Sequence, residues 1–322
     1  MKTKISKFMD IDRIEFIITW QCGGKCRHCQ IGDDINKQGS HRHVLSEYAV
    51  EAVKKLADTF EITSVMTFGG EPLHYPEETA ANHKAATECG IETRQIITNG
   101  FFTNSAGKSG NVADALAKAG VNDLLLSVDA FHQEHIPIEP VYQFARDIIN
   151  AKIPGAFLYP AWLINKEHEN PYNAKTKEIL EVFSDLAIAV SGYENRVDIG
   201  GLGGHAASLL REYYDSTDVK LLENCISEPC TEPLAVTSIS IVPNGDVDVC
   251  GFTIGNIYED DVIDVITRYN PYENESMQAL IQGGFAQLLS YAEKQGVVID
   301  TSKYCSACDV CHAVAKLLKP KS

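Results

Sequence analysis

The stretch that decides the fold is residues 22–29, which read Cys-Gly-Gly-Lys-Cys-Arg-His-Cys. It follows residues 14–20, an apolar and β-branched run that predicts a buried strand. Cys22, Cys26 and Cys29 are therefore expected on a loop at the carboxyl end of a strand, the edge at which barrels and open α/β sheets carry their sites. A four-iron cluster needs four ligands, so the spacing Cys-x3-Cys-x2-Cys leaves one iron open to a ligand from outside the protein.

The same spacing also allows a structural zinc site, in which His28 or a distant residue supplies the fourth ligand. Zinc and a four-iron cluster both accept thiolate ligands, so these residues alone leave the two interpretations open. The motifs further along the chain favour the cluster.

Composition narrows the class of protein. The chain has 322 residues, 44% of them hydrophobic, which suits a globular protein with a sizeable core. A net charge of −16 and a pI near 5.0 argue against a nucleic-acid or anionic-membrane partner. Residues 1–12 lack the apolar core of a signal peptide, and no apolar run approaches the roughly 20 residues of a membrane span. Ten cysteines in such a chain indicate metal binding or catalysis rather than disulfides, and predict a reducing, anaerobic cytoplasm.

Strand and helix patterns alternate over the first two hundred residues. Strands are predicted at residues 14–20, 63–68, 92–98, 123–128, 155–164 and 196–202. Helices are predicted between them, at residues 46–60, 77–89, 111–119, 139–151 and 175–186. Such alternation predicts a parallel sheet with right-handed crossovers, and six units are too few for a full eight-stranded barrel.

The pattern changes after Gly204. Residues 238–250 alternate apolar and polar side chains around Asn244-Gly245, a two-residue hairpin signal. Helices are predicted near residues 260–269 and 277–295, and three cysteines stand close to the end of the chain. We therefore predict two domains, residues 1–210 and a small α+β, cysteine-rich unit of residues 211–322.

A second motif follows the second predicted strand: Gly69, Gly70, Glu71 and Pro72. Glycines let the backbone approach a ligand closely, and the carboxylate of Glu71 is an acceptor for an ammonium group. A plain turn after a strand would explain the two glycines alone. The motif is more informative beside the cysteine loop than by itself.

These two motifs together resemble the radical S-adenosylmethionine (SAM) enzymes. In that family the cysteine triplet follows the first barrel strand, and the amino and carboxylate groups of SAM chelate the open iron of a [4Fe–4S] cluster. The resemblance implies that residues 69–72 hold the amino group of SAM, and that the fold is α/β, a partial (β/α)6 barrel of the TIM type. His28 stands where an aromatic residue often precedes the last cysteine.

Polar residues end the third and fourth predicted strands. In similar enzymes such residues contact the ribose and carboxylate of SAM, and here they are Thr98, Asn99, Ser127 and Asp129. Each is also a common helix cap, so both roles stay open. Asp129 with His135 partly resembles the fourth-strand motif of relatives with SPASM-type cluster domains.

A glycine-rich segment, residues 200–205, closes the sixth predicted strand. Its glycines permit close backbone contact with a flat ligand edge. The resemblance suggests that Gly201 contacts adenine or substrate, and a flexible exit from the barrel is the alternative.

The C-terminal cysteines form a second constellation. The spacing Cys230-x14-Gly245-x4-Cys250, followed by the pair Cys305 and Cys308, resembles the twitch and SPASM domains that bind auxiliary clusters. The resemblance implies one auxiliary [4Fe–4S] cluster held by these four cysteines; two clusters, or structural zinc, remain alternatives. Two further cysteines are alternate ligands: Cys225 and Cys311.

The sequence as a whole predicts a radical SAM enzyme that oxidises its substrate. The resemblance implies a peptide substrate of the ribosomally made kind or a small molecule from a biosynthetic route, and a reductant such as ferredoxin or flavodoxin. Only about a dozen residues precede the first strand, so we expect the leader of any peptide substrate to bind a separate protein or the barrel itself. The alternatives are a non-oxidative epimerase or rearrangement enzyme, and a protein that only transfers electrons between clusters.

Overall fold

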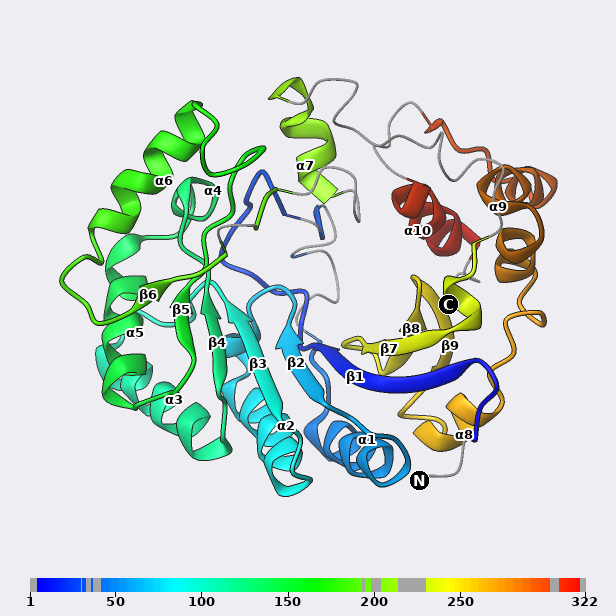
Figure 1. The fold of residues 1–322 in the computed structure, drawn as a ribbon, viewed down its shortest axis with the longest axis horizontal. Coiled ribbons are helices and arrows are strands. Elements are labelled where there is room, and N and C mark those ends of the chain that lie inside the picture. Colours follow the sequence, from blue (N-terminus) through cyan, green and yellow to red (C-terminus); the bar gives the residue numbers. More distant parts are fainter. Residues whose placement is uncertain are drawn as a thin grey trace.

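The computed structural model in Figure 1 places one curved sheet through most of the chain. The structure describes residues 5–29, 31–32, 36, 42–192, 195–197, 204–213, 230–301 and 307–318. Within these residues, no helix has both the length and the apolar character needed to cross a membrane.

The sheet has nine strands in the order β6-β5-β4-β3-β2-β1-β7-β8-β9. Every neighbouring pair from β6 to β7 is parallel, and β7–β8 and β8–β9 are antiparallel. The strands span Met9–Ile17 (β1), Ser64–Phe68 (β2), Thr93–Thr98 (β3), Asp123–Leu126 (β4), Ala156–Leu158 (β5), Ala189–Val190 (β6), Val236–Ile241 (β7), Asp246–Val249 (β8) and Phe252–Asn256 (β9). The predicted partial barrel of parallel β/α units is confirmed.

The helices span Ser46–Thr59 (α1), Pro76–Glu88 (α2), Ala106–Ala119 (α3), Ala130–Gln133 (α4), Ile138–Asn150 (α5), Pro171–Glu181 (α6), Gly204–Leu209 (α7), Val262–Thr267 (α8), Glu275–Lys294 (α9) and Ala307–Leu318 (α10). In Figure 1, most helices of the barrel, among them α1, α2, α3, α5 and α6, lie on the outer side of the sheet, whereas α7 and α10 lie on its open side. In α5 the apolar stripe Val141, Phe144, Ala145 and Ile148 is buried, at the i, i+3, i+4, i+7 spacing of one helix face.

The bounds of several predicted elements differ from the structure. Strand β1, predicted at residues 14–20, is Met9–Ile17, and helix α6, predicted at residues 175–186, is Pro171–Glu181. Helix α3 begins at Ala106 rather than at residue 111, because the side chain of Ser105 caps it by accepting from the backbone N–H of Lys108 at 3.4 Å. Strand β5 has only three residues, since Pro160 lacks the N–H that would continue the ladder.

The sixth strand was also misplaced. Strand β6 is Ala189–Val190, whereas residues 196–202 were predicted. Arg196 forms only an isolated bridge with Trp162, and residues 198–203 lie outside the described part of the chain.

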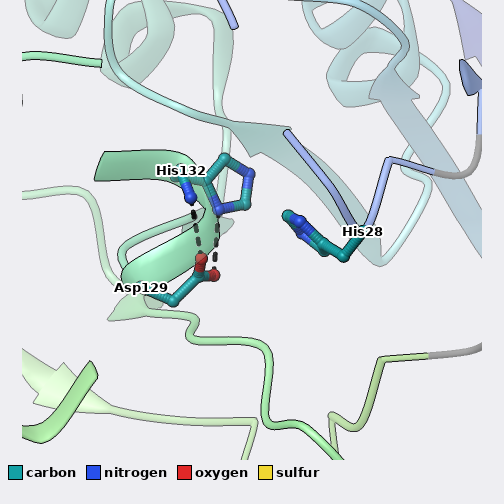
Figure 2. A group of neighbouring side chains, drawn as sticks. All are labelled: His28, Asp129 and His132. Atoms are coloured by element: carbon teal, nitrogen blue, oxygen red, sulfur yellow. Dashed lines mark hydrogen bonds and ion pairs between the residues drawn. The ribbon is translucent and has the colours of Figure 1, made fainter. Parts of the chain in front are cut away.

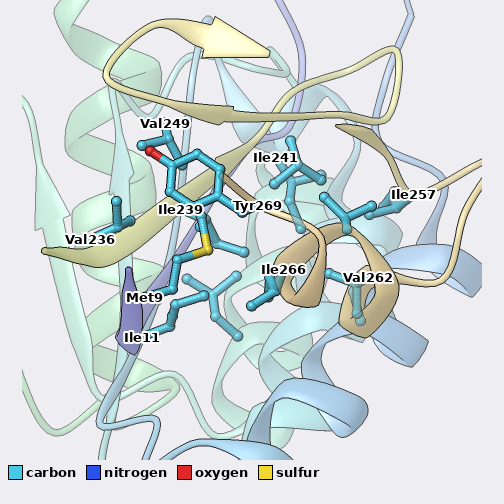
Figure 3. Packing of buried hydrophobic residues seen from close by; sticks show 14 of the residues in the cluster. Met9, Ile11, Val236, Ile239, Ile241, Val249, Ile257, Val262, Ile266 and Tyr269 are labelled. Atoms are coloured by element: carbon cyan, nitrogen blue, oxygen red, sulfur yellow. The ribbon is translucent and has the colours of Figure 1, made fainter. Parts of the chain in front are cut away.

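The part of the chain after residue 210 extends the same sheet. Strand β7 pairs in parallel with β1, so that Ile14 lies opposite Ile239. Figure 3 shows the result: Met9 and Ile11 of β1 pack with Ile239 of β7 and Ile266 of α8 in one hydrophobic cluster. The two predicted domains therefore share a sheet and a core.

The hairpin that follows β7 has a three-residue loop, not the predicted two-residue turn. The N–H of Gly245 donates to the carbonyl of Val242 at 2.8 Å, and the N–H of Val242 donates to the carbonyl of Asp246 at 3.0 Å. Gly245 has φ +85°, the left-handed conformation that such loops need at this position.

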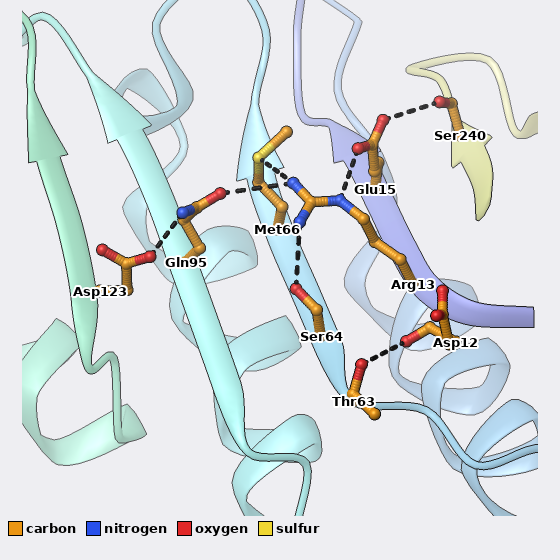
Figure 4. A network of polar contacts seen from close by, with 9 residues as sticks. All are labelled: Asp12, Arg13, Glu15, Thr63, Ser64, Met66, Gln95, Asp123 and Ser240. Carbon is orange, nitrogen blue, oxygen red and sulfur yellow. Dashed lines mark hydrogen bonds and ion pairs between the residues drawn. The ribbon is translucent and has the colours of Figure 1, made fainter. Parts of the chain in front are cut away.

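The inner side of the barrel is polar (Figure 4). The guanidinium of Arg13 on β1 bonds to Glu15 at 2.7 Å, to the sulfur of Met66 at 2.8 Å and to Gln95 at 3.3 Å. Alternate residues of the same strand, Ile14 and Phe16, are fully buried against the helices. The network links β1, β2 and β3 below the carboxyl ends of the strands.

Candidate active site

A cavity of about 430 Å³ opens at the carboxyl ends of β1 to β4. It is lined by the three thiols of the cysteine loop, by the glycines after β2, by residues at the ends of β3 and β4, and by three histidines. The predicted site residues among them are Cys22, Cys26, Cys29, Gly69, Gly70, Thr98, Asn99 and Ser127. Glu71 and Asp129 are fully buried and do not line it, Pro72 does not line it either, and Gly201 lies outside the described residues.

The three thiols lie in a protected environment. Cys26 is buried, and Cys22 and Cys29 are half-buried. Burial raises the pKa of Cys22 to about 12 and also raises the pKa values of Cys26 and Cys29. Two donors point at the sulfur of Cys22: the N–H of Gly24 at 3.3 Å and the side-chain amide of Asn99 at 3.4 Å. A bound metal group would supply the positive charge that favours the thiolates, and the residues present fit such a group.

The two glycines after β2 pack directly against the cysteine loop. The N–H of Gly70 donates to the carbonyl of Thr19 at 2.7 Å, and the N–H of Glu71 donates to the carbonyl of Gln21 at 2.7 Å. A Cβ on Gly70 would lie 2.2 Å from the carbonyl oxygen of Gln21, and one on Gly69 (φ +135°) would lie 2.7 Å from that of Thr19. Only glycine lets these two loops come so close.

Glu71 links the second and third loops. Its carboxylate accepts from the N–H of Leu73 at 2.9 Å, the hydroxyl of Thr98 at 2.7 Å and the N–H of Asn99 at 2.8 Å. Burial raises the pKa of Glu71 to about 7, although these hydrogen bonds oppose the shift. A contact of this carboxylate with a ligand ammonium stays a prediction; the structure adds its role in holding two cavity-lining loops together.

Asp129 caps α4 and orients a histidine (Figure 2). One carboxylate oxygen accepts from the N–H groups of Phe131 at 2.9 Å and His132 at 3.0 Å. The other lies 2.9 Å from Nδ1 of His132 and accepts from the N–H of Ala161 at 3.0 Å. Burial by itself would raise the pKa of Asp129, but His132 and these bonds hold it well below its usual range. Helix capping, one of the two roles left open for Asp129, is thus observed.

His28, Asp129 and His132 each place a possible ligand atom within 4.8 Å of the others. A carboxylate has about four lone-pair positions, and the four hydrogen bonds to Asp129 use them all. A metal ion at these three residues would have to displace one of the hydrogen bonds to Asp129. We therefore interpret Asp129 and His132 as a hydrogen-bonded pair rather than as part of a metal site.

His28 packs against this pair. Its ring lies edge-on to that of His132, with 4.7 Å between ring centroids, and 4.9 Å from that of Phe131. Burial lowers the pKa of His28 to about 4, so the ring is neutral near pH 7. In the described part of the chain, Nδ1 of His28 is buried without a hydrogen-bond partner.

Sequence reasoning missed two of the three histidines of the cavity wall, His132 and His205. His132, not the exposed His135, bonds to Asp129. The signal was the i, i+3 spacing of Asp129 and His132 at the start of a helix. His205 had no such signal: it reaches the cavity because its N–H donates to the carbonyl of Cys29 at 2.9 Å across the fold.

The C-terminal thiols that the structure describes lie outside this cavity. Cys230 is half-buried, and Cys250 and Cys308 are exposed. Although Cys250 is exposed as a residue, partial burial of its thiol raises its pKa to about 11, and the nearby Cys230, Glu232 and Cys308 add to that shift. A set of thiolates suits an iron–sulfur cluster or zinc. Of the other predicted ligands, Cys311 packs on the main core, and Cys225 and Cys305 lie outside the described residues.

Residues 16–158 match the family model described as Radical SAM superfamily. This span holds the end of β1, strands β2 to β5 and the predicted site residues from Cys22 to Asp129. None of the curated proteins matches the chain in sequence.

Solved structures resemble the chain in fold. One structure of anSMEcpe with bound AdoMet, which is SAM, matches 93% of this chain and 98% of its own chain at 13% identity. A second structure of anSMEcpe with bound AdoMet matches 91% of this chain and 87% of its own chain at 14% identity. Both have a TM-score of 0.50. BtrN in complex with AdoMet and 2-DOIA covers 92% of this chain and 91% of its own, at 15% identity and a TM-score of 0.44. At such identities the likeness to anSMEcpe supports the α/β partial barrel alone.

Proposed function

We propose that this protein is a radical SAM enzyme, which binds a [4Fe–4S] cluster through Cys22, Cys26 and Cys29 and cleaves SAM reductively. The observation that carries the proposal is that these thiols open onto one cavity of about 430 Å³ together with the Gly69–Gly70 backbone. The family match over residues 16–158 supports it. When bound, such a cluster supplies the electron that splits SAM into methionine and a 5′-deoxyadenosyl radical, which takes a hydrogen atom from the substrate.

The residues around the cavity have defined tasks in this proposal. The backbone of Gly69 and Gly70 lines the wall without side chains, which allows close approach of an amino-acid group. Ser127 offers a hydroxyl to a ribose or carboxylate, while the hydroxyl of Thr98 stays bonded to Glu71. His132, whose Nδ1 bonds to Asp129, presents its other ring nitrogen as an acceptor while it is neutral. The enclosed site also keeps water away from a reactive intermediate.

We also propose that the reaction is an oxidation, with a second [4Fe–4S] cluster held by Cys230, Cys250, Cys305 and Cys308. A substrate that loses a hydrogen atom, and then an electron and a proton, has undergone a two-electron oxidation. The shared electrostatic environment of Cys230, Cys250 and Cys308 supports an acceptor at this place. The substrate in this proposal is a peptide or a small biosynthetic molecule, and ferredoxin or flavodoxin supplies the electron in the cytoplasm.

An electron-transfer protein is the alternative from another class. Such a protein has no use for a cavity beside its thiols, and the cavity here has three polar side chains from β3 and β4 in its wall. The cavity therefore favours the enzyme. A structural zinc ion at the same thiols would likewise not need a ligand-binding cavity beside it.

The test is SAM cleavage by anaerobically reconstituted, reduced protein. We expect 5′-deoxyadenosine from the parent and none from the Cys22→Ala/Cys26→Ala/Cys29→Ala variant, which should keep the C-terminal metal. A parent that takes up iron but never cleaves SAM would make the protein an electron carrier. Cleavage by the triple variant would also end the proposal.

The oxidation is tested separately. Replacing Cys230, Cys250, Cys305 and Cys308 by Ala should remove the iron in excess of one cluster. A product with two hydrogens fewer than the substrate supports oxidation; a product of unchanged mass supports an epimerase or a rearrangement instead. Zinc in the C-terminal fraction would remove the electron acceptor and with it the oxidation argument.

A further inference from the structure

Cys250 stands in an unusual backbone conformation. Together with Gly251 it forms the two-residue turn between β8 and β9, in which Val249 pairs with Phe252. Both turn residues have positive φ, 50° for Cys250 and +79° for Gly251, as a type I′ turn requires. A non-glycine residue rarely adopts such a φ, and such residues concentrate at functional sites.

Gly251 makes room for a histidine. A Cβ on Gly251 would lie 2.6 Å from Nδ1 and 2.7 Å from Cε1 of His312, so the imidazole ring rests directly on the turn beside Cys250. A side chain at position 251 would force this ring to move away, so the contact depends on glycine.

Helix α10 brings this histidine to the thiols. Cys308 and His312 are four residues apart and so lie on one face of the helix. Val310 and Val314 are fully buried, and Cys311 packs beside them on the main core. Cys308 and His312 therefore lie along one ridge of α10, while Cys311 packs against the core.

An imidazole ring carries at least one N–H in either protonation state. A donor that faces a cluster sulfur stabilises the reduced cluster more than the oxidised one, because reduction adds negative charge to the sulfurs. Hydrogen bonds of this kind are among the main controls of cluster potential.

We propose that His312 donates a hydrogen bond to a sulfur of the auxiliary cluster next to Cys250 and raises the reduction potential of that cluster. The inference rests on the proposed function, in which the C-terminal thiols hold a [4Fe–4S] cluster. His312 is then a positioning residue, which makes the cluster a better acceptor for the electron that leaves the substrate.

The test uses the Cys22→Ala/Cys26→Ala/Cys29→Ala protein, so that only the auxiliary cluster titrates. Reduction is followed by electron paramagnetic resonance at fixed potentials. His312→Phe keeps a ring on the turn without an N–H, and should lower the ratio of reduced to oxidised cluster about tenfold, or about 59 mV for one electron. His312→Gln keeps a donor and should restore most of the ratio. Leu317→Ala, an exposed change on the same helix, is the control and should leave the ratio unchanged.

A second variant reaches the same bond without touching the histidine. Gly251→Ala should push the ring off the turn and lower the ratio as His312→Phe does, and the double variant should show no further change.

The outcomes separate the two proposals. Absence of iron–sulfur signal in the triple-alanine parent means that the auxiliary cluster, and so the proposed oxidation, is wrong. A normal cluster whose potential is the same in His312→Phe overturns the role of His312 alone. Loss of iron from His312→Gln also overturns it, because a ligand rather than a donor would then have been removed.

Discussion

The two cysteine sets of this protein are built in opposite ways. Cys22, Cys26 and Cys29 lie on one loop, buried or half-buried beside the cavity. The C-terminal set comes from separate elements: Cys250 from a hairpin turn and Cys308 from α10, both of them exposed. When all ligands lie on one loop, their spacing in the sequence predicts the site. When the ligands come from separate elements, the site depends on how those elements pack, which the spacing does not predict.

Both sets nevertheless depend on a glycine that lets another segment come close. Gly70 brings the loop after β2 against the backbone of the cysteine loop, and Gly251 brings α10 against the turn at Cys250. Gly70 contacts backbone atoms of Gln21, which cannot move without displacing the whole loop. Gly251 contacts the side chain of His312, which can rotate away. Substitutions should therefore be more damaging at the first set than at the second.

The largest effect is expected for Gly70→Ala. Its Cβ would lie 2.2 Å from the carbonyl oxygen of Gln21 and 2.9 Å from the carbonyl carbon of Trp20, so the two loops must separate. A displacement of about 1 Å near reacting groups costs roughly a hundredfold in rate, and we expect at least that loss of SAM cleavage. Iron analysis and a 5′-deoxyadenosine assay measure it.

Gly107→Ala is the matched control. This glycine lies in α3 with no atom within 4 Å of its would-be Cβ, so the change should leave SAM cleavage intact and stabilise the fold by about 0.4–1 kcal/mol. Equal cleavage in Gly70→Ala and the parent would mean that the two loops need not touch, and the comparison of the two glycines would fail.

The next effect concerns Glu71. Its folded pKa of about 7 lies above the ordinary value of 4.5, so its stabilising contribution is full below pH 4.5 and is lost as the pH rises through 7. A shift of this size corresponds to about 3 kcal/mol in the free energy of unfolding. Glu71→Gln should remove this pH dependence, and should lose about 1–3 kcal/mol at pH 5 because its amide group faces the donors on Leu73 and Asn99.

Urea unfolding at several pH values between 4.5 and 8 measures this change. The difference in stability between parent and variant should shrink as the pH rises. A constant difference over that range would show that the carboxylate does not titrate as its burial implies.

The parts of the fold that depend on local hydrophobic periodicity could be predicted from the sequence. The parallel β/α units and the amphipathic helices appeared in the predicted order, although the bounds of β1, α3 and α6 are shifted by several residues. The pairing of β7 with β1 could not be read, because their contact joins residues more than two hundred positions apart. The placement of β6 failed for a related reason: two residues of strand leave almost no period to detect.

The candidate site shows the same division. The spacing of Cys22, Cys26 and Cys29 and the two glycines after β2 were evident, and the structure places all five on one cavity. Residue type alone could not show that the carboxylates of Glu71 and Asp129 point into the protein, since both are equally good ligands, caps and links.

A smaller effect is expected for Asp129→Asn. Its depressed pKa means that its stabilising contribution is present above about pH 4 and is lost as the pH falls through the folded value. Asparagine can still cap α4, but its NH₂ group would face the Nδ1–H of His132 and the N–H of Ala161. We expect a loss of about 1–2 kcal/mol at pH 7 and a changed tautomer of His132 in nitrogen-15 NMR spectra.

Asp185→Asn is the control for that change. Asp185 is exposed and accepts one bond, from the hydroxyl of Tyr142 at 2.6 Å, so its replacement should alter stability by less than about 0.5 kcal/mol. An unchanged His132 tautomer in Asp129→Asn would mean that the carboxylate does not set the orientation of the ring.

The smallest effect separates two cysteines on one helix. Cys311 packs against the main core, so Cys311→Ala should cost about 1 kcal/mol of stability and leave the auxiliary iron in place. Cys308→Ala, at an exposed position, should leave stability of the metal-free protein nearly unchanged and release that iron. Iron content and urea unfolding of both variants in the metal-free and reconstituted states decide the matter. The opposite result, loss of iron from Cys311→Ala and not from Cys308→Ala, would mean that Cys311 rather than Cys308 binds the cluster. The C-terminal set would then resemble the first set, because its ligand on α10 would be a half-buried cysteine.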